Sequence, residues 1–88
     1  MQTEHAVHVA DAREMDLSDG SVDLVVTSPP YPMIAMWDDL FRDLDPAIGD
    51  ALAAGDGDRA FSLMHDCLDP VWDRVVGALA PGGIVCVN

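Results

Sequence analysis

The fold is decided by the run Val22-Asp23-Leu24-Val25-Val26-Thr27-Ser28-Pro29-Pro30-Tyr31-Pro32. Its first part, 22–27, is almost continuously apolar, which is typical of a parallel strand that is covered on both faces. The prolines that follow cannot donate backbone hydrogen bonds, and each restricts the residue before it. The chain therefore leaves the sheet in a stiff, extended turn over 28–32. Because ligands of open α/β sheets bind at the carboxyl ends of strands, this turn is the candidate site.

Three further segments complete the predicted architecture. A short apolar run over 6–10 predicts a first strand, and 84–87 predicts a last strand after the turn Ala80-Pro81-Gly82-Gly83. Between them, 58–80 predicts a helix, kinked near Pro70, because apolar residues recur at helical steps. This apolar stripe is expected to pack on the sheet and comprises Phe61, Met64, Leu68, Trp72, Val75 and Leu79. The sequence thus predicts one α/β domain over 1–88, with about three parallel strands and helices packed on them.

The turn and its surroundings resemble a known family. Ser28-Pro29-Pro30-Tyr31 is similar to the catalytic Ser/Asp/Asn-Pro-Pro-aromatic motif of DNA amino-methyltransferases. The flanking segments 7–11, 21–26 and 71–88 are similar as well. The resemblance implies a partial Rossmann-like fold, S-adenosylmethionine as methyl donor, and a place in DNA methylation and restriction-modification. The form Thr-Ser-Pro-Pro-Tyr is typical of the branch that methylates N4 of cytosine.

The resemblance also implies roles for individual residues. Ser28 to Tyr31 form the catalytic set, namely Ser28, Pro29, Pro30 and Tyr31. Asp11, at the end of the first predicted strand, is the candidate for binding the adenosine part of the methyl donor, although a helix N-cap fits it equally. Trp37 is the candidate for the substrate pocket, with core packing at helical spacing as the alternative.

The chemistry of methylation suits this set of groups. An exocyclic amino group is a poor nucleophile because its lone pair is delocalised into the ring. Acceptors fixed in space, here the Ser28 side chain and the Pro29 carbonyl, would draw on the amino hydrogens and localise that lone pair. Tyr31 would stack on a base flipped out of the duplex.

The glycine-rich Phe-x-Gly-x-Gly loop that holds the methionine end of the donor in this family is missing from these residues. In circularly permuted members the catalytic motif comes first and that loop late, so the loop is expected beyond Asn88. The partner is then double-stranded DNA, held through regions outside the chain, with a missing C-terminal half or a second chain completing the site.

The charge of the chain agrees with DNA being held by other regions. The 88 residues carry a net charge of −12 and contain no lysine. DNA-binding surfaces are normally basic, so DNA contact by this segment is disfavoured. An acidic surface without lysine also predicts a halophilic, haloarchaeal source, where salt screens self-repulsion.

The remaining features are ordinary. Cys67 and Cys86 are expected to be buried, reduced thiols, and no metal site is predicted because no thiol or histidine lies at ligand spacing from either. The sequence shows neither a signal peptide nor an apolar run of the roughly 20 residues that span a membrane, so a cytoplasmic protein is expected.

Three alternatives to cytosine-N4 methylation are to be weighed. Adenine-N6 methylation uses a similar motif, more often with Asp first. Methylation of a protein glutamine usually has Asn first, so Ser28 counts against it. The remaining alternative is that the chain is a non-catalytic remnant or interaction module. In that case, Ser28 and Tyr31 would matter only for folding.

Overall fold

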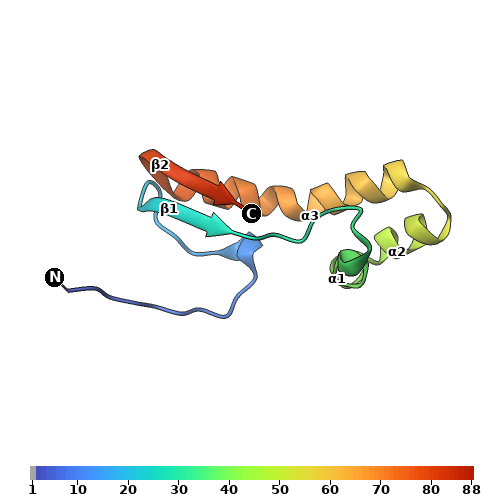
Figure 1. Ribbon diagram of the computed structural model, residues 1–88, viewed down its shortest axis with the longest axis horizontal. Helices are drawn as coiled ribbons and strands as arrows, with labels where there is room; N and C mark the ends of the chain where they lie inside the picture. The colour runs from blue at the N-terminus through green and yellow to red at the C-terminus, as the bar shows by residue number, and fades with distance from the viewer. Residues whose placement is uncertain (1) are drawn as a thin grey trace.

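The computed structural model describes residues 2–88 and forms its sheet from two parallel strands, β1 (Val22–Thr27) and β2 (Leu79–Val87) (Figure 1). The range of β1 is the one that its apolar run predicts. Leu24, Val25 and Val26 pair in step with 84–86 of β2. The mixed helix and strand content is compatible with a partial α/β fold.

β2 begins at Leu79, before the strand start that the sequence predicts at 84, because the glycines of the expected turn allow the chain to stay beside β1. Val22 pairs with Leu79 but Leu24 pairs with Ile84, so the register shifts within this stretch. A Cβ on Gly83 would lie 2.9 Å from the Ala80 carbonyl oxygen and 3.2 Å from that of Val22. Only glycine permits this close approach of the backbones.

The long helix α3 (Gly57–Ala78) packs against the short helices that precede it and leads directly into β2. Asp56 is its N-cap: the Asp56 side chain accepts a hydrogen bond from the Arg59 N–H. The helix passes through Pro70 without interruption and ends two residues before the predicted 80, because Leu79 already has extended backbone angles.

The core lies at the N-terminal half of α3, where α1 (Asp38–Leu44) and α2 (Pro46–Ala53) pack against it (Figure 1). Its buried members are Phe41, Ile48, Met64, Cys67 and Leu68. The expectation that the apolar stripe of the helix packs wholly on the sheet is therefore wrong. Met64 and Leu68 pack into this core, and Phe61, which is half exposed, lies against the His65 ring instead.

The strand predicted over 6–10 is not formed. These residues run apart from the sheet (Figure 1), and Val7 and Val9 are almost fully exposed. A strand needs a neighbour to pair its backbone groups, and none lies beside this segment in the part of the chain described. The sheet of residues 2–88 consequently has two strands rather than three.

One face of the sheet is open. Leu24, Val26 and Ile84 are 57%, 72% and 59% exposed, and Leu24 is paired with Ile84. Val25 and Val85, which point to the opposite face, are half-buried. None of the helices over residues 2–88 combines the length and the apolar character needed to cross a membrane.

Candidate active site

The loop Ser28–Tyr31 lies at the carboxyl end of β1, next to the end of β2. The Asn88 N–H donates a hydrogen bond of 2.9 Å to the Thr27 carbonyl, so the end of β2 holds the chain where the loop begins. Ser28 is exposed, while Pro29 and Pro30 are half-buried. The loop therefore carries an exposed serine on a backbone that its prolines stiffen.

Tyr31 begins a tight turn that ends the loop. The Ile34 N–H donates to the Tyr31 carbonyl at 3.4 Å across Pro32 and Met33. Proline is common at the second position of a type II turn, and the third position requires a positive φ. Met33 has φ +66°, which fits that turn. Tyr31 itself is 44% exposed.

The turn is tied to α3 by an interaction that sequence reasoning did not find. The Met33 N–H donates to the Met64 Sδ at 3.4 Å, across 31 residues of sequence. A thioether is a weak acceptor that no motif marks, so the sequence carries no signal for this contact.

Asp11 is held by Arg13 in the structure. It is the N-cap of a short 3-10 helix, η1 (Ala12–Glu14), and accepts from the Arg13 N–H at 2.9 Å. The Arg13 guanidinium adds three contacts of 2.6–3.1 Å to the two carboxylate oxygens. These hydrogen bonds lower the pKa of Asp11 to about 2. The N-cap alternative is thus present, and the role in binding the methyl donor stays a prediction.

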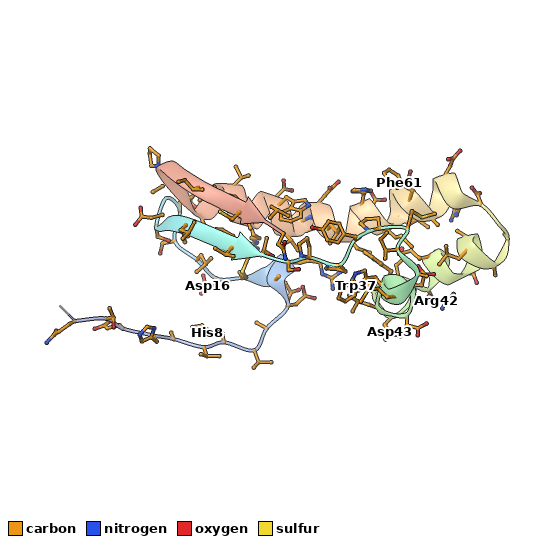
Figure 2. The ribbon with its side chains drawn as sticks, viewed as in Figure 1. His8, Asp16, Trp37, Arg42, Asp43 and Phe61 are labelled. Carbon is orange, nitrogen blue, oxygen red and sulfur yellow. The ribbon has the colours of Figure 1, made fainter. Side chains whose placement is uncertain are left out.

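Trp37 ends a second short 3-10 helix, η2 (Ala35–Trp37), where the chain enters α1 (Figure 2). It is half-buried and packs against the core, which is the alternative that helical spacing favours. Its neighbours Ile34 and Met36 are 50% and 74% exposed. They place exposed apolar side chains just after the motif, and a pocket role for Trp37 stays a prediction.

The two cysteines differ in their surroundings. Cys67 is buried in the core, and burial raises the pKa of its thiol. Cys86 is exposed, contrary to expectation, because the sheet face on which it lies with Val26 is open. Within residues 2–88, acidic, histidine and cysteine side chains do not gather in threes at a geometry that would hold a metal ion.

Two curated proteins are similar to the whole chain. The Type II methyltransferase M.MthZI of Methanothermobacter thermautotrophicus is 46% identical over 90 aligned positions, which include 100% of this chain. The Type II methyltransferase M.MjaI of Methanocaldococcus jannaschii is 44% identical over 98 aligned positions, which include 98% of this chain.

The chain spans only 25% and 32% of the lengths of these two relatives. No protein-family profile matches the chain, and no solved structure matches it. At 44–46% identity, the chain is homologous to one segment of Type II methyltransferases.

Proposed function

We propose that this chain carries the catalytic loop of a DNA methyltransferase that transfers a methyl group from S-adenosylmethionine to N4 of cytosine. The observation that carries the proposal is the exposed Ser28–Tyr31 loop at the carboxyl end of β1, in a chain similar along its length to Type II methyltransferases. The Ser-Pro-Pro-Tyr form of the motif supports the cytosine-N4 product.

Ser28 and Pro29 supply the chemistry. The Ser28 Oγ and the Pro29 carbonyl oxygen accept hydrogen bonds from the two amino hydrogens of the base. This would localise the lone pair on the nitrogen for attack on the methyl group of the donor. The methyl–sulfur bond would break as the nitrogen–carbon bond forms, and one amino proton would pass to solvent. The acceptors act through preorganisation, because Pro30 and the strand end at Thr27 fix the backbone between them.

Tyr31 binds the target base. The residue is 44% exposed, and the turn to Ile34 fixes its backbone. A base inside a duplex is out of reach, so it is flipped out and stacked against an aromatic face. The phenol hydroxyl is not needed for stacking, so the ring alone carries this role.

The residues present do not complete a site for the methyl donor. The Asp11 carboxylate accepts hydrogen bonds from the backbone N–H and the guanidinium of Arg13, and its role toward the adenosine part of the donor stays a prediction. Glycine residues in the Phe-x-Gly-x-Gly order do not occur in these 88 residues. We therefore assign binding of the methionine end of the donor, and DNA recognition, to regions outside them; the net charge of −12 agrees with DNA being bound elsewhere.

The test is substitution of Ser28 in the protein as the cell produces it, including any regions outside these 88 residues. That protein is assayed for DNA methylation in high salt. Ser28→Ala removes one acceptor and should lower kcat about a hundredfold, by analogy with loss of one hydrogen bond at a preorganised site. Ser62→Ala is the matched control, because Ser62 is an exposed serine on α3. Tyr31→Phe should retain activity and Tyr31→Ala should lose it.

Nucleoside mass analysis of the methylated DNA decides the product. N4-methylcytosine is expected, and N6-methyladenine would replace this proposal by the adenine alternative. If Ser28→Ala and Ser62→Ala were equally active, the catalytic role of the loop would be refuted. If the wild-type protein methylated no DNA, the result would support the alternative that the chain is a non-catalytic remnant or interaction module.

A further inference from the structure

Met33 has an unusual backbone for its residue type. Among residues 2–88 it is the one non-glycine residue with a positive φ, at +66°. It occupies the turn position where glycine is favoured, since a Cβ is strained there. Residues held in such conformations persist only where their surroundings over-determine them, and they cluster at functional sites.

The surroundings that hold Met33 belong to α3. Its N–H donates to the Met64 Sδ at 3.4 Å, and Met64 is fully buried in the core. The Met33 side chain reaches the first residue of the same helix, where its Cε lies 3.7 Å from the position of a Cβ on Gly57. Met33 itself is 45% exposed, so water would otherwise compete for its N–H.

The other end of the loop is also held. The Asn88 N–H donates to the Thr27 carbonyl at 2.9 Å. The loop Ser28–Tyr31 is thus suspended between an anchor at the end of β2 and an anchor on α3. The second anchor acts through the turn whose first residue is Tyr31.

We propose that Met64 is a positioning residue for the catalytic loop: its sulfur accepts the Met33 N–H, stabilises the left-handed turn, and thereby fixes Tyr31. The inference rests on the proposed function for its catalytic consequence, but the contact can be tested without it. Without the acceptor, Met33 relaxes toward negative φ and the backbone of Tyr31 moves with it. Catalytic groups must be held to within about 0.5 Å, so such a shift is costly.

The contact is tested by amide hydrogen exchange at Met33 in this chain. In the wild type, exchange at Met33 should be slowed although the residue is nearly half exposed. Met64→Leu keeps an apolar side chain of similar volume and removes the acceptor, so this protection should be lost. Met36→Leu is the matched control, because Met36 is 74% exposed and makes no such hydrogen bond in the part of the chain described. Circular dichroism verifies that each variant is folded.

The positioning role is tested by kinetics of methyl transfer in the natural gene product. Met64→Leu should lower kcat on the order of tenfold to a hundredfold, as expected for a displacement of about 1 Å, with KM for the methyl donor unchanged. Met33→Gly removes the strain of the turn, because glycine adopts a positive φ without cost, and its kcat is the reference for the double variant. The double variant Met33→Gly with Met64→Leu should recover most of the loss, since the turn then needs no anchor.

Each outcome decides one part. Equal exchange at Met33 in Met64→Leu and Met36→Leu would overturn the anchor. Lost protection with unchanged kcat would overturn the positioning role. Absence of recovery in the double variant would mean that Met64→Leu acts through core packing, which also refutes positioning. An inactive wild type would refute the proposed function, and the exchange experiment would still decide the anchor.

Discussion

At the residue scale, the ion pair of Asp11 and Arg13 is the best-defined polar contact of the N-terminal region. The guanidinium hydrogen bonds hold the pKa of Asp11 at about 2, below the ordinary 3.8. Because the folded pKa is the lower one, the pair stabilises the fold above about pH 4. That stabilisation is lost as pH falls from 3.8 through about 2.

Arg13→Gln should therefore raise the pKa of Asp11 toward 3.8. The shift is measured by following the Asp11 carboxyl carbon in an NMR pH titration. Arg59→Gln is the control, because only the backbone N–H of Arg59 takes part in the hydrogen bonds found for it among residues 2–88. A pKa of Asp11 that stays near 2 in Arg13→Gln would show that the backbone N–H of residue 13 alone causes the shift.

The individual site residues also differ in how well the sequence predicts their roles. Ser28 and Tyr31 could be found from their motif, and the structure leaves both exposed. The sequence left Asp11 between two roles, because an acid at the end of an apolar run fits a ligand and an N-cap equally well. Met64 was predicted only as part of the apolar stripe, and its contact with Met33 could not be predicted, because the sulfur meets the Met33 N–H only in the folded chain.

At the scale of elements, α3 contains a proline in its interior and yet is uninterrupted from Gly57 to Ala78. Pro70 has no N–H to donate to the carbonyl four residues before it, and its ring crowds that turn. The helix persists because its buried side chains on both sides of Pro70, including Leu68 and Val75, keep it in place.

Pro70→Ala should stabilise the protein, because alanine restores the missing donor at an exposed position. The free energy of unfolding should rise by up to about 3 kcal/mol, measured by urea denaturation. Pro46→Ala is the matched control: Pro46 occupies the first turn of α2, where proline is well tolerated, so its replacement should not stabilise. An unchanged or lower urea midpoint for Pro70→Ala would contradict the argument.

Elements with their own strong pattern were predictable, and elements that depend on neighbours were not. The run Val22–Thr27 forms its strand because nearly every residue is apolar and the prolines stop it. The segment 6–10 has a similar pattern but no partner for its backbone. β2 begins earlier than predicted because pairing with Val22 outweighs the turn preference of Gly82 and Gly83.

At the scale of the whole molecule, charge dominates. A net charge of −12 on 88 residues opposes folding through self-repulsion. Screening shortens the reach of this repulsion from about 10 Å at 0.1 M salt to about 3 Å at 1 M. The elongated shape, with extents of 55 × 24 × 21 Å, and the open sheet face leave little core to offset it.

The melting temperature should therefore rise with KCl between 0.1 and 2 M, by about 5 °C or more, which corresponds to roughly 1 kcal/mol for a domain of this size. Asp43, on the outer side of α1 (Figure 2), provides the test of mechanism. Asp43→Asn should raise the melting temperature at low salt and have no effect at high salt. Asp39→Asn is the control, because it removes one negative charge but also an ion pair of 2.8 Å with Arg42. Its gain in melting temperature at low salt should therefore be smaller than that of Asp43→Asn. Equal effects of Asp43→Asn at both salt concentrations would refute screening as the cause.

The sequence by itself determined the strand β1, the stiff loop after it, the long helix and the parallel return strand. These follow from local properties: apolar runs, helical periodicity, and prolines that lack a donor. Tertiary structure alone decided that α1 and α2 take Met64 and Leu68 into a core away from the sheet, that 6–10 stays unpaired, and that Met33 is anchored on α3. Each of these features depends on contacts between residues that are far apart in the sequence. A local sequence pattern does not specify which distant residues will meet after folding.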